Sequence, residues 1–245
     1  MKCLILAAGY ATRLYPLTRN FPKPLLKVGG KPIVDWLIDD LQDIADGFVV
    51  VTNHKYAAIF SEWAQGRDRP IVILDDGTTE NERRLGAVRD IEMAVKSLGI
   101  DEDTLVMAGD NMLDFSLKGF VRFAEACGCS CVMCHEEPRL EALQKTAVIT
   151  VAQSGVITSY EEKPRMPRSQ LAVPPFYYYT AGDLNRVGEA LEDGCGFDAP
   201  GSFAAWLCSK VAMHAWKMSG ERHDIGDITS YLAVRDSYRE LSGGD

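Results

Sequence analysis

Apolar and polar residues alternate along this chain with two different periods. Short runs rich in β-branched residues predict buried strands, and the segments between them place apolar residues at helical spacing. In the first half, strands are predicted at Lys2–Leu6, Phe48–Thr52, Ile71–Leu74, Leu105–Ala108 and Cys129–Cys134. Helices are predicted between them at Pro32–Ile44, Tyr56–Ala64, Leu85–Leu98 and Lys118–Ala126. This alternation predicts an α/β fold with a mostly parallel, Rossmann-like sheet flanked by helices.

The pattern changes after about residue 136. Further strands are predicted at Ala147–Val151, Val156–Tyr160, Phe176–Thr180 and Val211–Lys217, and helices at Gly182–Glu192, Pro200–Ser209 and from Ile228 to the C-terminus. Turns rather than helices join the first three of these strands, which indicates a small mixed α+β lobe beside the parallel sheet. We therefore expect residues 1–245 to form a single domain, with one functional part over about 1–135 and another over about 136–245.

Composition narrows the class of protein. A chain of 245 residues can bury a core without disulfides or structural metals. Its formal net charge of −9 argues against a nucleic-acid partner, because phosphate backbones require clustered Lys and Arg. No apolar window reaches the ~18 residues that a membrane span needs, and the chain starts without a secretory leader. We therefore expect a cytoplasmic protein with no membrane partner.

The seven cysteines raise the question of a metal or redox site. An odd number without a leader favours a reducing compartment. Cys131 and Cys134 have the CxxC spacing of zinc and redox sites, but no second ligand pair with zinc-finger spacing is present. Cys129, Cys131 and Met133 alternate along an apolar run, as residues on one face of a strand do. The pattern therefore favours buried strand cysteines.

The most specific motif begins at the end of the first predicted strand, as LAAGYATRLYPLT over residues 6–18 and FPKPLL over residues 21–26. Its small residues allow the backbone to approach a phosphate or base closely, and N–H groups there can bind oxyanions. Arg13 and Lys23 supply positive charge for a triphosphate, and the prolines on both sides of Lys23 restrict its backbone. The spacing matches neither the GxGxxG dinucleotide motif nor a Walker A loop.

This string resembles the signature of nucleotidyltransferases that act on sugar phosphates, such as glucose-1-phosphate thymidylyl- and uridylyltransferases, and of the related phosphocholine cytidylyltransferases. Later motifs match in the same order: GDN at 109–111, EEKP at 161–164 and DIG at 224–226. The resemblance covers most of the chain. It implies a GT-A-type sheet, a nucleoside triphosphate and a phosphorylated small molecule as substrates, and Mg²⁺ as cofactor. The resemblance is also compatible with a homodimer.

The resemblance also assigns roles to residues. Arg13 and Lys23 match catalytic cations, and Asp110 and Asp224 match the carboxylates that bind Mg²⁺, a cation that prefers oxygen ligands. The expected nucleotide-binding residues are Leu6, Ala7, Ala8, Gly9, Thr12, Arg13, Asn81, Gly86 and Asp110. In that set the Asn81 amide offers one donor and one acceptor to a pyrimidine edge. The expected acceptor-binding residues are Asn111, Ala147, Glu162, Lys163 and Val173.

Several positions depart from the family pattern. Ala11 replaces the second glycine of the signature, which is tolerable if its φ is negative. The segments at 146–148 and 172–175, which match the acceptor pocket of the family, lack the glycines of many relatives. The sequence therefore defines the acceptor less well than it defines the reaction. Asp227 replaces a common Thr and is either the N-cap of the last helix or a third carboxylate near the metal. Three interpretations are open for five aromatic residues: they pack in the core, stack on a sugar or surround a quaternary ammonium. These residues are Tyr177, Tyr178, Tyr179, Trp206 and Trp216.

The implied reaction is an in-line attack of the acceptor's phosphate oxygen on the α-phosphorus, with pyrophosphate as leaving group. Three interpretations stay open. The first is a sugar-1-phosphate nucleotidyltransferase that uses dTTP or UTP. The second is a cytidylyltransferase that uses CTP and a non-sugar phosphate or phosphonate such as phosphocholine. The third is a catalytically silent nucleotide-sensing module, against which the joint presence of Asp110, Asp224, Arg13 and Lys23 argues.

Overall fold

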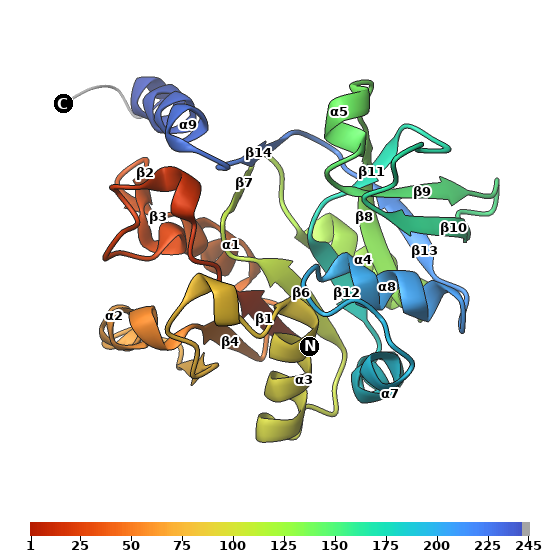
Figure 1. Ribbon diagram of the computed structural model, residues 1–245, viewed down its shortest axis with the longest axis horizontal. Coiled ribbons are helices and arrows are strands. Elements are labelled where there is room, and N and C mark those ends of the chain that lie inside the picture. The colour runs from red at the N-terminus through yellow and green to blue at the C-terminus, as the bar shows by residue number, and fades with distance from the viewer. Residues whose placement is uncertain (242–245) are drawn as a thin grey trace.

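The computed structural model describes residues 1–241, and its main element is one large sheet with helices packed on both faces (Figure 1). The strand order is β10-β9-β11-β8-β12-β6-β1-β4-β5, and β13 pairs with β8 outside this path. The strands of this sheet are β1 (Lys2–Leu6), β4 (Gly47–Thr52), β5 (Ile71–Asp75), β6 (Thr104–Ala108), β8 (Cys131–Glu136), β9 (Ala147–Val151), β10 (Ile157–Glu162), β11 (Leu171–Val173), β12 (Phe176–Tyr179) and β13 (His214–Lys217).

The N-terminal part of the sheet has the predicted parallel arrangement. β1 lies between β4 and β6 and is parallel to both, and β5 is parallel to β4. β12 then pairs antiparallel with both β6 and β8, and β9, β10 and β11 follow in antiparallel pairs. The predicted α/β class is thus confirmed. The strands expected in a lobe beside the sheet instead extend it, because β12 bridges the two parts through continuous hydrogen bonding.

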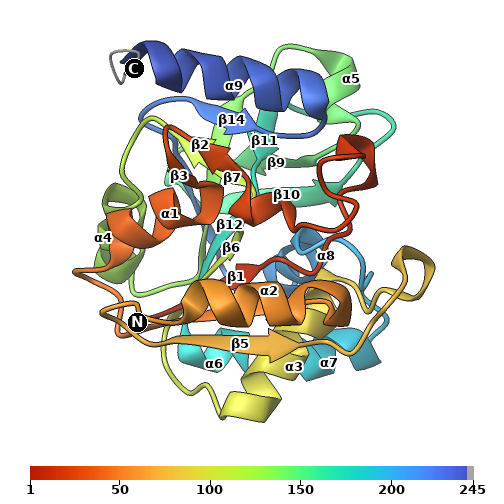
Figure 2. The same cartoon turned by 90° about the vertical axis from the view of Figure 1, so that its left-hand side faces the viewer.

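Helices cover both faces of the sheet (Figures 1 and 2). One face packs against α3 (Ala87–Leu98), α7 (Val187–Glu192) and α8 (Gly201–Cys208), and the other against α1 (Ile33–Leu41), α2 (His54–Ala64) and α4 (Lys118–Cys127). Leu4 of β1 lies in the first core, whereas Cys3 and Ile5 lie in the second. This is the period of two expected for a strand buried on both sides. Within residues 1–241, no helix is both long and apolar enough to cross a bilayer.

The remaining elements surround the carboxyl ends of the parallel strands. They are β2 (Lys27–Val28), β3 (Lys31–Pro32), β7 (Asn111–Leu113), β14 (Arg222–Asp224), α5 (Leu140–Leu143), α9 (Ile228–Leu241) and 3₁₀ turns at Thr12–Leu14, Lys23–Leu25 and Asn81–Arg83. The short helix α6 (Ala181–Leu184) instead follows β12 at the amino ends of the parallel strands. β7 and β14 form a separate two-stranded sheet. α9 lies over β2 and β14 in Figure 2, and its Tyr231 and Val234 join Leu14 and Val28 in a small third core.

Some elements differ from the predicted ones. The helix predicted at 182–192 is divided into α6 and α7 at Asn185 and Arg186, where the Ala181 carbonyl accepts from both the Asn185 N–H (3.1 Å) and Asn185 Nδ2 (2.9 Å). The helix predicted at 32–44 ends at Leu41, whose carbonyl accepts from both Ile44 and Ala45. β7, β11 and β14 have three residues each, too few to show a period in the sequence. The last four residues of the predicted final helix, 242–245, lie outside the described residues.

The cysteines fall into two groups. Cys131 and Cys134 are buried in β8, which confirms the prediction that the CxxC sequence belongs to a strand. Burial raises the pKa of the Cys131 thiol to about 12 and that of Cys134 to about 11. Cys127 and Cys129 are joined by a disulfide, a bond that the odd cysteine count and the expected reducing compartment do not predict.

Candidate active site

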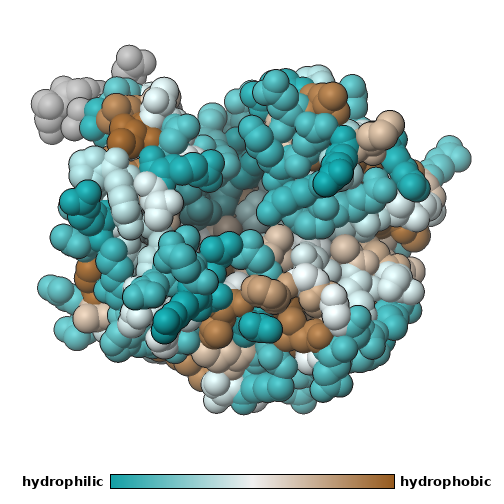
Figure 3. Space-filling model, viewed as in Figure 1, coloured by the Kyte–Doolittle hydropathy of each residue, from teal (hydrophilic) through white to brown (hydrophobic). Residues whose placement is uncertain are grey.

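A cleft of about 320 Å³ opens at the carboxyl ends of β1 and β6, where open α/β sheets bind their ligands. Figure 3 shows a recess on this face, between the part that carries α9 and the part that carries β9 and β10, with hydrophilic residues around it. The cleft lining includes these predicted site residues: Leu6, Ala7, Ala8, Gly9, Arg13, Lys23, Gly86 and Asp110. A smaller hollow of about 220 Å³ beside α1 and β5 is lined by other residues.

The loop after β1 is held against the cleft from two sides. The Gly109 N–H donates to the Leu6 carbonyl (3.1 Å), and Asn53 Nδ2 donates to the Ala8 carbonyl (2.9 Å). A β-carbon on Gly109 would lie 2.8 Å from the Ile5 side chain, so this close approach requires glycine. The small residues of the motif therefore bring backbone, rather than side chains, to the cleft wall.

Ala11 does not have the negative φ on which its tolerance depends. Its φ is 46° and its ψ is 44°, the left-handed conformation that favours glycine. Thr18 Oγ1 donates to the Ala11 carbonyl at 2.8 Å, and the Leu14 N–H donates to the same carbonyl at 3.0 Å. These bonds hold the residue in place. Thr12, which follows it, starts a 3₁₀ turn and is not among the residues that line the cleft.

Asp110 is the centre of a chain of polar side chains. Lys23 Nζ donates to Asp110 Oδ2 at 2.7 Å, and the lysine side chain is only 8% exposed. Asn111 Nδ2 donates to Asp110 Oδ1 (3.0 Å), and Arg222 Nη1 donates to Asn111 Oδ1 (2.6 Å). Because a carboxylate accepts about four hydrogen bonds, the two donors orient Asp110 and leave it capacity for a ligand.

The pairing of β7 with β14 brings the C-terminal motif to the same place. Asp224 pairs with Asn111, the residue after Asp110. Gly226 lines the cleft, and a β-carbon there would lie 3.8 Å from Arg13 Nη1 and 3.9 Å from Asp224 Oδ2. The two predicted metal-binding carboxylates and a predicted catalytic cation therefore gather around one end of the cleft.

Asp227, the neighbouring carboxylate, has a structural role. The Ser230 N–H donates to Asp227 Oδ1 (2.8 Å), and the Asp227 N–H donates to Ser230 Oγ (3.0 Å). These reciprocal bonds are those of a residue at the start of a helix, directly before α9. They lower the pKa of the Asp227 carboxyl. Of the two interpretations of Asp227, the N-cap is the one that this geometry supports.

The opposite wall of the cleft is formed by the start of α3 and a distant loop. A β-carbon on Gly86, whose φ is +93°, would lie 2.5 Å from the Phe197 carbonyl oxygen, so only glycine fits. Arg84 Nε donates to Asp198 Oδ1 (2.7 Å), and this pair lowers the pKa of Asp198. Both side chains line the cleft. Asn81 belongs to the 3₁₀ turn before Arg84 but is not among the lining residues, so the predicted base-reading amide is not at the cleft wall in this conformation.

One buried and one half-buried acid in the cleft wall were not predicted. Asp90, on α3, is 4% exposed, and its Oδ1 has no hydrogen-bond partner among the described residues. Burial raises the pKa of Asp90 to about 7, and the nearby Asp76 contributes further. Asp76 accepts from Thr78 through Oδ1, whereas its Oδ2 is likewise without a partner in that part of the chain. Both residues line the cleft, and their unpaired oxygens result from tertiary packing that the sequence alone does not show.

Of the five predicted acceptor residues, Asn111 lies in β7 beside Asp110, and the other four lie on or beside the extended part of the sheet. Glu162 pairs with Ala147, and Ala147 pairs with Val173, so three of them form a row across β10, β9 and β11. The Lys163 N–H donates to the Thr146 carbonyl (3.1 Å), directly beside this row. Burial raises the pKa of Glu162. Ala147 and Val173 are buried, so their backbones rather than their side chains are available to a ligand.

The acceptor row is separate from the cleft lining. Within residues 1–241, the residues that line the cleft do not include Asn111, Ala147, Glu162, Lys163 or Val173. The two regions meet at Asp198, because the positive charge of Lys163 contributes to the lowered pKa of that cleft carboxyl. Arg222 also connects them, since it bonds Asn111 beside Asp110.

The five aromatic residues singled out in the sequence pack against protein. Tyr177, Tyr178 and Tyr179 are at most 3% exposed. Trp216 packs against Phe120 at a ring distance of 5.8 Å, and Trp206 packs against Phe203 at 6.3 Å. Their packing supports the interpretation as core residues over that of a cage for a quaternary ammonium.

Taken together, the site has two cations, two carboxylates and an exposed backbone turn at one end, and the buried Asp90 and the half-buried Asp76 at the other. Such a set suits a polyphosphate at the first end and a polar ring at the second. The nucleotidyl transferase family model matches residues 2–240. A UTP–glucose-1-phosphate uridylyltransferase of Haloferax volcanii is 32% identical over 229 residues, which cover 92% of this chain and 91% of that protein.

Solved structures share the fold. A UDP-glucose pyrophosphorylase, determined in complex with UDP-glucose, has a TM-score of 0.83 at 21% identity, over 98% of each chain. A Bacillus anthracis protein assigned as a glucose-1-phosphate thymidylyltransferase, in complex with a sucrose, also has a TM-score of 0.83, at 20% identity, over 100% of this chain and 98% of that one. The family match and the Haloferax relative agree with the resemblance found in the sequence motifs. The chain therefore belongs to the nucleotidyl transferase family and is an enzyme of the nucleotidyltransferase class.

Proposed function

We propose that this enzyme transfers a nucleotidyl group from UTP or dTTP to a sugar 1-phosphate, giving a nucleotide sugar and pyrophosphate, and that the reaction requires Mg²⁺. The observation that carries this proposal is the strand pairing of Asp224 with Asn111, which brings both motif carboxylates to the cleft end that holds Arg13 and Lys23. The Haloferax relative, which acts on UTP and glucose 1-phosphate according to its name, supports the choice of substrates.

The residues at this end fit a magnesium ion. Asp110 keeps acceptor capacity after its bonds to Lys23 and Asn111, and Asp224 is exposed beside it. Both supply carboxylate oxygens, the ligands that Mg²⁺ prefers, and the phosphates and water would complete its shell. When bound, the ion supplies positive charge to the reacting phosphates.

The remaining chemistry belongs to the chain itself. A phosphate monoester is anionic near neutral pH, so its oxygen attacks the α-phosphorus without a general base, and the bond to pyrophosphate breaks. Arg13 would stabilise the charge that develops on pyrophosphate. Lys23, nearly buried and held by Asp110, would orient the α-phosphate. Catalysis then depends on positioning and charge, which fixed cations in a cleft provide.

The acceptor is assigned to the row formed by Glu162, Ala147 and Val173. A half-buried carboxylate such as Glu162 accepts hydrogen bonds from sugar hydroxyls, and Lys163 would attract the acceptor's phosphate. The core packing of the aromatic residues favours this acceptor over phosphocholine.

A substrate panel tests the proposal. The common nucleoside triphosphates are combined with hexose 1-phosphates and with phosphocholine, and pyrophosphate release is measured with Mg²⁺ and with EDTA. We expect release with UTP or dTTP and a hexose 1-phosphate, and none with EDTA. Preference for CTP and phosphocholine would overturn the sugar acceptor, and release that is insensitive to EDTA would overturn the magnesium requirement.

A matched pair of variants tests the site. Asp224→Asn should lower turnover strongly, because it removes one of the two proposed metal ligands. Asp227→Asn, three residues later, should retain both turnover and stability, because an asparagine oxygen accepts the N-cap bond from the Ser230 N–H about as well as aspartate does. Equal turnover in the two variants would contradict the assignment of Asp224.

A further inference from the structure

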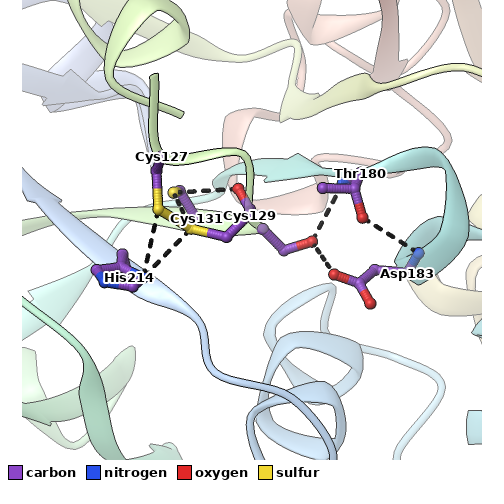
Figure 4. The surroundings of a disulfide bond; sticks show 7 residues. Cys127, Cys129, Cys131, Thr180, Asp183 and His214 are labelled. Atoms are coloured by element: carbon purple, nitrogen blue, oxygen red, sulfur yellow. Dashed lines mark hydrogen bonds between the residues drawn. A yellow bond between two sulfur atoms is a disulfide. The ribbon is translucent and has the colours of Figure 1, made fainter. Parts of the chain in front are cut away.

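Two cysteines and a histidine lie close together at the amino ends of the strands, opposite to the ends that form the cleft. Cys127 ends α4, Cys129 precedes β8, and His214 begins β13, 85 residues after Cys129 (Figure 4). β8 and β13 are parallel to each other, and β8 runs in the same direction as β6, because both are antiparallel to β12. Asp110 follows the carboxyl end of β6, so this cluster at the amino ends lies away from the transfer site.

The three side chains have the spacing of a metal site. His214 Nδ1 lies 3.5 Å from Cys127 Sγ and 3.2 Å from Cys129 Sγ, and all three ligand atoms are within 4.8 Å of one another. In a tetrahedral zinc centre with Zn–S near 2.3 Å and Zn–N near 2.0–2.1 Å, the sulfur and nitrogen atoms are about 3.5 Å apart. His214 Nδ1 therefore already lies at the distance from each sulfur that binding to one shared zinc ion requires. Only the two sulfur atoms, which the disulfide joins, have to move apart.

The backbone holds His214 in this position. Its N–H donates to the Ser130 carbonyl (3.2 Å), and it pairs in register with Cys131. Ser130 is itself fixed, since its hydroxyl donates to Asp183 Oδ2 (2.6 Å) and accepts from the Thr180 N–H (3.1 Å). The histidine and both cysteines are half-buried, so an ion can reach them from solvent while the ring stays oriented.

We propose that Cys127, Cys129 and His214 bind a thiophilic divalent cation, Zn²⁺, when the two cysteines are reduced. Two thiolates and one imidazole provide three ligands and leave the fourth tetrahedral position to water. The disulfide and the metal centre exclude each other. A phosphine reductant gives two electrons to the S–S bond and is oxidised to its oxide, two protons from water complete the thiols, and zinc binding then releases those protons.

Zinc titration of the reduced enzyme tests the site. The protein is reduced with the phosphine, freed of reductant and metal under nitrogen, and titrated with Zn²⁺ against a chromophoric chelator. We expect one ion per chain, and an affinity lowered at least ~10–100-fold in His214→Ala and in Cys129→Ser, since even loss of an outer-shell partner costs that much. Cys195→Ser and His54→Ala, which change a free cysteine and a histidine outside the cluster, should bind as the parent does.

Two further measurements make the result independent of folding defects in the variants. Co²⁺ bound to the reduced parent should give thiolate-to-metal charge-transfer bands, and these should be absent from the untreated, disulfide-bonded protein. Zn²⁺ should protect Cys127 and Cys129, but not Cys195, from alkylation read by peptide mass spectrometry. Unchanged affinity in His214→Ala, equal binding by oxidised and reduced protein, or alkylation that zinc does not slow would each overturn the proposal.

Discussion

The nucleotide side and the acceptor side of this enzyme are built in different ways. On the nucleotide side, the functional groups follow shortly after parallel strands, as the 7–9 segment follows β1 and Asp110 follows β6. On the acceptor side, Glu162, Ala147 and Val173 come together only because three antiparallel strands pair in one register. Local sequence therefore determines the first set, and tertiary pairing determines the second. We expect substitutions on the first side to affect the chemical step and those on the second to affect acceptor recognition.

The largest effect should come from removing charge at the nucleotide side. Asp110→Asn and Arg13→Ala should each lower turnover at least ~100-fold, because fixed charges that stabilise the transition state are lost. The assay is pyrophosphate release at saturating substrates. Asp101→Asn is the control, since this exposed acid lies before the opposite end of β6. Near-normal turnover in Asp110→Asn or Arg13→Ala would break the distinction between the two sides.

A second prediction concerns Asp90, whose environment on the nucleotide side comes from tertiary packing. Its pKa is raised by burial to about 7, from 3.8. Between about pH 4 and about pH 7 the folded state keeps a proton that the unfolded chain has lost, so stability falls with rising pH over that window and levels off above it. The contribution is at most about 1.4 kcal/mol per pH unit. Asp90→Asn should lack it.

Urea unfolding of both proteins across this pH range measures the difference. The stability of Asp90→Asn relative to the parent should rise from about pH 4 to about pH 7 and then stay constant. Asp198→Asn serves as the control, because the ion pair with Arg84 lowers the pKa of Asp198 from 3.8, so that its contribution changes only below about pH 4 and its profile should run parallel to that of the parent over this range. Parallel pH profiles for Asp90→Asn and the parent would show that Asp90 is not a buried acid.

The same contrast explains what the sequence predicts and what it does not. The strand before Gly9 and the strand before Asp110 are long apolar runs, so both motifs are placed correctly from the pattern alone. β14 has three residues, two of them charged, and nothing in its sequence announces that Asp224 pairs with Asn111. The buried Asp90 lies on a helix whose other polar residues face solvent, and only the packing of the Phe197 loop on Gly86 closes that side of the cleft.

The third prediction sharpens the acceptor side. Glu162→Gln should raise the KM for the sugar phosphate about tenfold and leave the KM for the triphosphate nearly unchanged, because a charge-assisted hydrogen bond to the acceptor is weakened. Its neighbour Glu161 points to the other face of β10, where it forms an ion pair with Arg168 (3.3 Å). Glu161→Gln should therefore change neither KM. An equal rise in both KM values in Glu162→Gln would place this residue outside the acceptor site.

The smallest effect concerns Ala11, where the signature loop itself departs from its relatives. The left-handed conformation of Ala11 lowers the free energy of unfolding by about 1 kcal/mol or more. Glycine avoids this strain, but the greater freedom of its unfolded chain lowers the free energy of unfolding by about 0.4–1 kcal/mol. Ala11→Gly should therefore gain about 0.5 kcal/mol in urea unfolding. Ala8→Gly, in the same loop but at a residue without positive φ, should lose stability. If both variants lost stability equally, the bond from Thr18 would have to hold Ala11 without strain, and the nucleotide loop would be as dependent on tertiary contacts as the acceptor row.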